Sequence, residues 1–305
     1  MNMSGNFDGD RAERLFDVSG RAVVVTGAGS GIGRAMAEVM AANGARVMLA
    51  DIDPAVEEVA SALRDGGAEV DTCVTDIADP GSVDKLFAAA VSRFGRVDVT
   101  FANAGINRGM SVRDYQGSIL RFRREDWDAV ISTNLTGAFT TLAASARVMV
   151  PQGSGSIIVT ASTASLRAEP MVGYAYVASK AAVVNLVRQA SIELAPSGVR
   201  VNAIAPGPIV TNIGKGRPKP PDFVERWLET IPVGRRGEPQ ELKGIGLLLA
   251  SQASSFVTGA VWTIDGGASA LTQGWMRDVA PLPGATGDED WINADPGGAN
   301  DRARP

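Results

Sequence analysis

The glycine-rich stretch Thr26–Gly33, with the sequence TGAGSGIG, constrains the fold of this chain more than any other feature. It follows the apolar, β-branched run Ala22–Val25, which predicts a buried strand, and it leads into Arg34–Met40, which has helical composition and spacing. The glycines therefore lie in a strand-to-helix turn, where missing Cβ atoms let backbone amides approach a phosphate and let the helix pack closely on the sheet. Taken alone, such a turn has an alternative interpretation as an ordinary tight loop.

Asp51 favours a dinucleotide-binding turn over that alternative. It follows a second apolar run, residues 45–50, and lies 18 residues beyond Gly33, close to where dinucleotide-binding folds place the carboxylate for the ribose hydroxyls of adenosine. Two features at the expected spacing make an ordinary loop a poor explanation.

Strand and helix patterns alternate along most of the chain. Apolar runs that predict strands cover residues 22–26, 45–50, 69–74, 97–102, 156–160, 199–204 and 260–264. Helical patterns cover residues 31–43, 54–65, 80–94, 124–150, 173–196 and 238–251, and Asp79-Pro80 and Glu238-Pro239 have the composition of helix starts. This alternation predicts an α/β fold with a doubly wound parallel sheet, helices on both faces and right-handed crossovers. Two long connections, residues 106–123 and 205–232, follow strand ends, where open α/β sheets bind ligands.

Composition removes several classes of function. The net charge is -5 and no basic stripe is present, which argues against a nucleic-acid partner. No apolar run is long enough to span a bilayer, and the N-terminus lacks the hydrophobic segment of a signal peptide, so we expect no membrane association. The single Cys73 excludes an intrachain disulfide and a cysteine metal cluster, and it fits a reducing cytoplasm.

The chain contains no histidine. This absence excludes Ser-His-Asp hydrolysis, histidine-ligated metals and imidazole acid–base catalysis. Proton chemistry in an enzyme of this composition must use Tyr, Lys, Asp, Glu or solvent.

Tyr176 and Lys180 are candidates for that chemistry. They stand four residues apart in the helical segment 172–194, which puts them on one face of the helix. A phenol has an ordinary pKa near 10, and a neighbouring ammonium favours the phenolate. A surface Tyr and Lys on an amphipathic helix is the alternative for this pair taken alone.

Five motifs in register resemble the short-chain dehydrogenase/reductase family over residues 16–268. They are TGAGSGIG, Asn103-Ala104-Gly105, Asn134, the YVASK segment ending at Lys180, and Pro206-Gly207. The resemblance implies a single Rossmann domain with a seven-stranded parallel sheet, commonly assembled as a tetramer. It also implies metal-free hydride transfer between NAD(P) and an alcohol or carbonyl.

The resemblance further implies a role for each matching catalytic residue. Tyr176 is expected to act as the general acid–base, and Lys180 to lower its pKa and hold the nicotinamide ribose. Asn134 resembles the asparagine that bends its helix and anchors a water linked to the lysine. The pattern favours Ser162 as the hydroxyl that positions the substrate oxygen, although the commoner family spacing selects Thr163.

The same resemblance implies a set of cofactor contacts. They are Gly27, Ser30, Gly31, Ile32, Gly33, Asp51, Ile52, Asp76, Ile77, Asn103, Ala104, Gly105, Tyr176, Lys180, Pro206, Gly207, Ile209 and Thr211. Asp76 has a competing interpretation as an ordinary turn residue, and Asn103 is expected to be mostly structural. NAD is the expected cofactor because Asp51 would repel a 2′-phosphate. The positions where NADP-preferring relatives place a basic residue hold Ser30 and Ile52.

We therefore expect a cytoplasmic, homotetrameric, NAD-dependent oxidoreductase that interconverts a small secondary alcohol and a ketone without metal. The alternatives are an NAD-binding sensor without turnover and an acyl-carrier-protein-type ketoreductase. Sensors of this family generally lack the tyrosine or the lysine, and such a ketoreductase would usually require NADPH and a basic docking patch. The expected organisation is an N-terminal arm at 1–17, an oxidoreductase domain at 18–270 with a lid near 212–232, and a C-terminal tail at 271–305.

Overall fold

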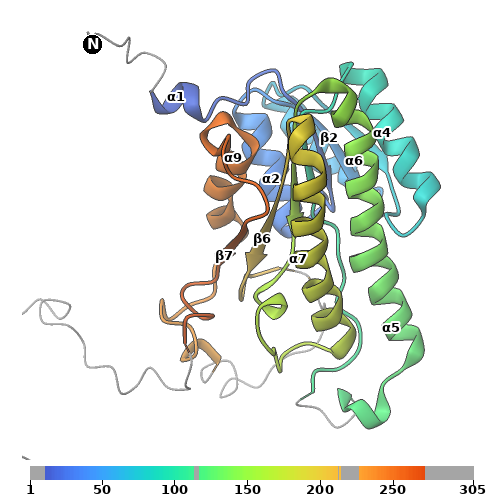
Figure 1. The fold of residues 1–305 in the computed structure, drawn as a ribbon, viewed down its shortest axis with the longest axis vertical. Helices are drawn as coiled ribbons and strands as arrows, with labels where there is room; N and C mark the ends of the chain where they lie inside the picture. The colour runs from blue at the N-terminus through green and yellow to red at the C-terminus, as the bar shows by residue number, and fades with distance from the viewer. Residues whose placement is uncertain (1–10, 113–116, 212, 214–226, 272–305) are drawn as a thin grey trace, which may run out of the picture.

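A computed structural model describes residues 11–112, 117–211, 213 and 227–271 (Figure 1). Seven parallel strands form one sheet in the order β3-β2-β1-β4-β5-β6-β7. The strands are β1 (Ala22–Thr26), β2 (Arg46–Asp51), β3 (Val70–Val74), β4 (Val99–Ala102), β5 (Gly155–Thr160), β6 (Val199–Pro206) and β7 (Val261–Ile264). The predicted doubly wound α/β fold is thereby confirmed.

Helices cover both faces of this sheet (Figure 1). One face carries α4 (Pro80–Phe94), α6 (Ala138–Gln152) and α7 (Tyr174–Leu194). The other face carries α2 (Gly31–Ala42), α3 (Val56–Asp65) and α9 (Lys243–Ala250). The remaining helical elements of the described chain are α1 (Ala12–Leu15), α5 (Arg124–Ile131), and the short helices at Ile119–Arg121, Ser132–Gly137, Thr163–Ser165, Ala195–Ser197, Pro239–Leu242 and Gln252–Ser254.

The two faces of β1 supply two separate apolar cores. Val24 packs with the helices of one face, whereas Val23 and Val25 pack with those of the other, because successive side chains of a strand point in opposite directions. All three side chains are fully buried, as expected for a parallel strand covered on both sides. The central strands are thus fixed from both faces, and their ends form a firm platform for loops.

The proline-containing helix starts are confirmed. Asp79 accepts a hydrogen bond from the backbone N–H of Gly81 at 2.9 Å, directly before α4. Glu238 and Glu241 form a reciprocal capping box at the start of the short helix Pro239–Leu242.

The structure divides the predicted helix 124–150 into three parts. A π-helical segment, Ser132–Gly137, joins α5 to α6. The side chain of Asn134 in this segment hydrogen bonds to the backbone of Ile106, and such widened turns are frequent at functional sites. Periodicity alone does not reveal a local change of helical repeat that a distant loop imposes.

The expected arm, lid and tail fall partly beyond the described residues. Ala12–Leu15 form a single helical turn with no buried side chain, and residues 1–10 are outside the description. Most of the expected lid, residues 214–226, and the tail from residue 272 also lie outside it. Among the described helices, none is both long and apolar enough to cross a membrane.

Candidate active site

The predicted site residues gather at the carboxyl ends of the strands. β1 pairs with β2 on one side and β4 on the other, so successive crossovers run in opposite directions from this point. A crevice outside such a reversal is where open α/β sheets bind ligands. The glycine turn follows β1, the Asn103 segment follows β4 and Ser162 follows β5.

The glycine turn is shaped by close backbone contacts. Gly27 and Gly31 have positive φ angles of 68° and 54°, which side chains other than glycine rarely adopt. A Cβ on Gly33 would overlap the carbonyl oxygen of Gly27, and one on Gly27 would lie 2.9 Å from the Cα of Ala104. Ser30, the residue before α2, makes no side-chain capping bond, so the first-turn amides of this helix are open to an anion.

Asp51 is held by the backbone on both of its oxygens. Oδ2 accepts from the N–H of Gly29 at 2.9 Å, and Oδ1 accepts from the N–H of Asp53 at 3.1 Å. Its register partner on β3 is Val74, which is 60% exposed, and the adjacent Ile52 is 65% exposed. Exposed apolar side chains beside a fixed carboxylate suit the adenosine half of a dinucleotide.

Sequence reasoning missed Gly29 and Val74 as members of this corner of the site. Gly29 lies inside the glycine motif, and a Cβ there would stand 3.0 Å from Oδ2 of Asp51. Val74 ends the third apolar run, so its position as the last residue of a strand was the available signal.

The cation nearest to this turn in the sequence is engaged elsewhere. Arg34 donates to Glu38 at 2.8 Å, and Lys243 donates to the other oxygen of Glu38 at 2.9 Å. Burial raises the pKa of the Glu38 carboxyl, but the hydrogen bonds from Lys243 and Arg34 outweigh it and lower that pKa overall. Glu38 therefore remains ionised and holds both cations.

Asp76 and Ile77 follow β3, as predicted, but their side chains have local roles. Oδ1 of Asp76 accepts from the backbone N–H of Ala78 at 2.9 Å, which is the turn geometry of the competing interpretation. The Ile77 side chain is buried in the core, where a Cβ on Gly137 would lie 2.9 Å from it. Exposed Asp76 can still contact a ligand, whereas Ile77 can do so only through its backbone.

Asn103 joins the ends of three strands, which agrees with its expected structural role. Its Nδ2 donates to the carbonyl of Thr26 at 3.2 Å, and its Oδ1 accepts from the hydroxyl of Thr160 at 3.0 Å. The hydroxyl of Thr26 accepts from the backbone N–H groups of Asn103 and Ala104 at 3.0 and 3.1 Å. This network fixes the floor of the crevice between β1, β4 and β5.

Asn134 fixes the segment after β4 from the side of the π-helical turn. Its Oδ1 accepts from the N–H of Ile106 and its Nδ2 donates to the carbonyl of the same residue, both at 2.8 Å. A Cβ on Gly105 would lie 3.3 Å from this Oδ1 and 3.6 Å from Nζ of Lys180, so Asn134 and Lys180 flank one glycine. A buried Asn with both polar atoms paired excludes the solvent-facing alternative for a helical asparagine.

Lys180 is buried and points at the end of β5. Its Nζ donates to the carbonyl of Thr160 at 2.6 Å and lies 5.8 Å from the centre of the Tyr176 ring. Burial lowers the pKa of this ammonium to about 8, because desolvation penalises the charged form.

Tyr176 lies on the same face, next to Ser162. Burial raises the pKa of the Tyr176 phenol, a hydrogen bond with the Ser162 hydroxyl opposes this, and the charge of Glu169 adds to the rise. The free protein thus keeps the phenol protonated, and no lowering by Lys180 is evident in it. A buried tyrosine–lysine pair is not the surface pair of the alternative interpretation.

The geometry favours Ser162 over Thr163 as the hydroxyl beside the tyrosine. Ser162 Oγ accepts from the N–H of Ala164 at 3.1 Å and also meets Tyr176, whereas Thr163 is 4% exposed and begins the next short helix. The Ser162 hydroxyl therefore both caps the short helix that follows it and forms a hydrogen bond with the phenol of Tyr176.

The segment after β6 completes the crevice. Gly207 donates its N–H to the carbonyl of Ile264 at 3.0 Å, directly after the buried Pro206, and Ile209 pairs with Gly237 in an isolated bridge. Cγ2 of Thr211 would lie 3.4 Å from a Cβ on Gly31, so this segment reaches the glycine turn. Among the described residues, no cluster of three or more His, Cys, Asp or Glu side chains could hold a metal ion.

Comparison with known proteins identifies the chain. The family model described as enoyl-(acyl carrier protein) reductase matches residues 27–269. A solved short-chain type dehydrogenase/reductase from Mycobacterium marinum is 37% identical, with a TM-score of 0.76 over 83% of this chain and 97% of that one. The chain belongs to the short-chain dehydrogenase/reductase family.

Two curated relatives show how widely substrates vary in this family. The 3-oxoacyl-(acyl-carrier-protein) reductase of Thermotoga maritima is 37% identical over 254 residues, which cover 82% of this chain and 98% of the relative. The L-rhamnose 1-dehydrogenase (NAD(P)(+)) of Azotobacter vinelandii is 38% identical over 256 residues, which cover 81% and 96%. Both relatives are oxidoreductases, and one name specifies a carrier-bound acyl group whereas the other specifies a sugar.

A nicotinamide dinucleotide fits the residues of this crevice. The N-terminus of α2 has no side-chain cap, so its backbone N–H groups are free to bind a phosphate. The close contacts of the glycines leave no space for side chains that would block this approach. Asp51 is fixed for ribose hydroxyls, and the buried Lys180 ammonium lies at the strand end where the nicotinamide ribose is expected.

Proposed function

We propose that the protein is an NAD-dependent oxidoreductase that interconverts a secondary alcohol and a ketone. The observation that carries the proposal is the meeting of Tyr176, Ser162 and Lys180 at the carboxyl end of β5, beside the glycine turn. In a chain without histidine, a buried phenol with a hydroxyl and an ammonium at its side is the best-equipped acid–base group.

The residues divide the chemistry as follows. NAD supplies the hydride acceptor when it is bound. In the direction of oxidation, Ser162 donates a hydrogen bond to the substrate oxygen, and the Tyr176 phenolate accepts the proton of the alcohol as the C–H bond breaks. In reduction, the phenol returns this proton to the oxygen of the ketone. Asn134 keeps Ile106 and the loop after β4 in place around the reacting carbon.

NAD is the proposed cofactor in preference to NADP. Asp51 has no cation as a partner in the described residues, since Arg34 and Lys243 are bound to Glu38. A 2′-phosphate would therefore meet a fixed negative charge without a compensating positive one. A carrier-protein ketoreductase stays the second candidate, because a relative with that name is 37% identical.

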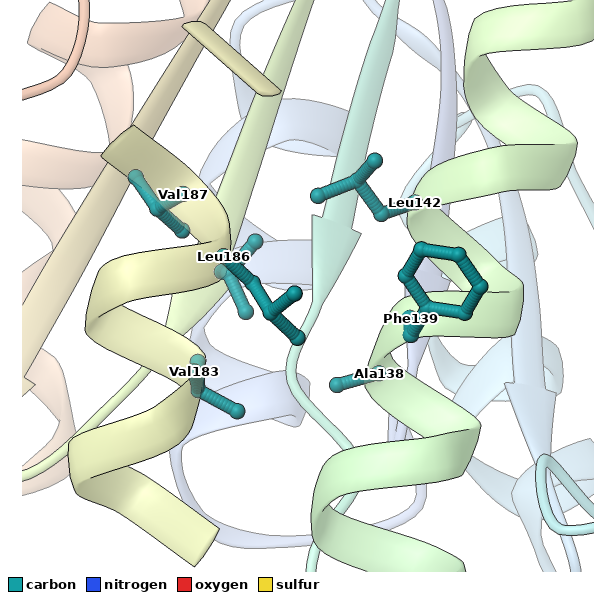
Figure 2. Close-up of a pocket in the computed structure, with 7 residues that line it drawn as sticks. Ala138, Phe139, Leu142, Val183, Leu186 and Val187 are labelled. Carbon is teal, nitrogen blue, oxygen red and sulfur yellow. The ribbon is translucent and has the colours of Figure 1, made fainter. Parts of the chain in front are cut away.

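We also propose that four copies of the chain assemble into a homotetramer. A shallow apolar groove runs between α6 and α7 on the outer face of the sheet (Figure 2). Phe139 at its edge is 52% exposed and adjoins the apolar side chains of this groove, which is the surface that we propose a second copy of the chain covers. Light scattering on the purified protein measures the assembly directly.

The catalytic assignment is tested with Tyr176→Phe. The variant should still bind NAD, because the hydroxyl acts mainly in the transition state, and kcat should fall about 10²–10⁴-fold. Cofactor affinity is measured by calorimetry, and turnover with a panel of secondary alcohols and ketones. Activity within threefold of the parent would remove Tyr176 from the mechanism, whereas a parent that binds NAD without any turnover would support the sensor.

A further inference from the structure

Two polar side chains on the loops around the start of α7 have hydrogen-bonding capacity that the proposed chemistry does not use. They are Asn107, in the loop after β4, and Glu169, in the loop after Ser162. Neither belongs to the groups that transfer the proton or bind the dinucleotide.

Asn107 is held beside the first turn of α7. Asn134 fixes the preceding residue, Ile106, through both backbone groups at 2.8 Å, and the Ile106 side chain packs against the small apolar cluster that includes Tyr176. A Cβ on Gly173, three residues before Tyr176, would lie 3.3 Å from the carbonyls of Arg108 and Met110. The loop therefore passes along the start of α7, and Asn107 lies between its two anchored ends.

The amide oxygen of Asn107 is buried and has no hydrogen-bond partner in the described structure. A buried polar atom without a partner costs about 1–3 kcal/mol, so such atoms are rare unless something else pairs with them. A substrate hydroxyl that reaches the loop after β4 would supply the missing partner.

Glu169 approaches Tyr176 from the opposite loop. Its Oε1 accepts from the N–H of Met171 at 3.1 Å, and its carbonyl accepts from the N–H of Val172, whose side chain packs against the same apolar cluster that includes Tyr176. The carboxylate is close enough to raise the pKa of the phenol. No lysine or arginine forms an ion pair with it among the described residues, so this charge is not neutralised by protein.

We propose that Asn107 and Glu169 form a hydroxyl-recognition subsite, and that the substrate is a polyol with hydroxyl groups next to the reacting carbon. The inference rests on the proposed alcohol oxidation. Two acceptors on opposite loops bind two donors, and a carbon chain with neighbouring hydroxyls presents donors on both sides of the reacting carbon. The same carboxylate repels an anionic substrate, so a sugar acid of equal length is a poor substrate.

The experiment compares substrates of one chain length with NAD. The probes are a hexitol panel (D-sorbitol, D-mannitol and galactitol), 2-hexanol and D-gluconate. In the parent, the best hexitol should exceed 2-hexanol and D-gluconate by at least about tenfold in kcat/KM, since a site built for hydroxyls discriminates strongly against analogues that lack them.

Variants assign this preference to the two side chains. Asn107→Leu should lower kcat/KM for the hexitol about tenfold or more, while 2-hexanol stays within about threefold. Glu169→Gln also removes a charge that raises the pKa of Tyr176, so its readout is the ratio of kcat/KM for the hexitol to kcat/KM for 2-hexanol, which should fall about tenfold. Glu169→Gln should also relieve the discrimination against D-gluconate. The matched control is Glu125→Gln, which alters a carboxylate on α5 that is 75% exposed, and no substrate should respond to it.

The outcomes separate this inference from the function on which it rests. A parent that oxidises 2-hexanol better than every hexitol overturns the polyol assignment and leaves the oxidoreductase intact. Equal losses for both substrates in the variants show a structural role for the two loops and overturn the subsite. A folded parent that binds NAD and turns over no probe, alcohol or ketone, with either cofactor overturns the proposed function itself.

Discussion

Replacement of Asp51 by Ala should change cofactor preference chiefly by weakening NAD. The structure holds the carboxylate through the N–H groups of Gly29 and Asp53 at 2.9 and 3.1 Å, so it cannot turn away from a ligand without losing both bonds. Two unit charges about 5.5 Å apart repel by about 3 kcal/mol at an effective dielectric constant of about 20. A hundredfold preference for NAD requires about 2.7 kcal/mol, which this repulsion supplies before the ribose bonds are counted.

The assay is kcat/KM for NAD and NADP at one fixed alcohol concentration. The parent should prefer NAD by at least about a hundredfold. Asp51→Ala should lose about 10–100-fold with NAD, since hydrogen bonds to a charged group contribute about 1.5–3 kcal/mol. With NADP, the relief of the repulsion should be offset by the loss of the acceptor that fixes the turn through Gly29 and Asp53, so the net change should be small. The two cofactors should then differ by less than about tenfold.

Two companion variants separate charge from turn structure. Asp51→Asn keeps an acceptor for Gly29 and removes the charge, so it should use NADP better than Asp51→Ala does. Asp53→Ala is the neighbouring control, because among the described residues its carboxylate accepts only from the exposed N–H of Ala55 at 3.0 Å. Equal kcat/KM of the parent with NAD and NADP, or an equal loss of kcat/KM with both cofactors in Asp51→Ala, would refute the role of Asp51. Arg34 would then be the residue that contacts the cofactor in its place.

Three further predictions follow from the catalytic geometry. Ser162→Ala should lower kcat about 10²-fold, whereas Thr163→Val should stay within about threefold; equal small losses would contradict the assignment. Asn134→Leu should lower the free energy of unfolding by about 2–5 kcal/mol in urea titrations, since it strips both backbone groups of Ile106 of their partners. Because burial raises the pKa of Tyr176, alcohol oxidation should accelerate as pH rises from 6 to 10, whereas ketone reduction, which uses the protonated phenol, should change little over this range. Initial rates in both directions measure this, and an oxidation rate that falls with pH would exclude the phenolate as base.

The fold was predictable because its signals are local and repeated. Each strand of the sheet coincides with an apolar run, and β1 is buried throughout because both its faces are covered. Glycine at positions 27, 31 and 33 was informative for a related reason: backbone geometry and close contacts there exclude any side chain. Such constraints depend on a few adjacent residues and are therefore visible in the sequence.

The remaining parts of the site depend on contacts between distant segments. The sequence spacing left Ser162 and Thr163 as competitors, and only the orientation of the turn after β5 places Ser162 beside the phenol. The π-helical segment around Asn134 depends on a loop 28 residues away. Neither Asn107 nor Glu169 belongs to a motif, so their positions on two loops around the start of α7 have no counterpart in the sequence pattern.

The proton chemistry of this site is best explained by two opposed effects on one phenol. Burial raises the pKa of Tyr176, and the ammonium that could oppose this is itself weakened, with its pKa lowered to about 8 and its Nζ bonded to the carbonyl of Thr160. The free protein is therefore a poor base at neutral pH. A positive charge added beside the phenol favours the phenolate, and the oxidised nicotinamide ring carries one. Loss of the tyrosyl proton should consequently accompany the binding of oxidised cofactor, which prevents the buried base from forming before the hydride acceptor is in place.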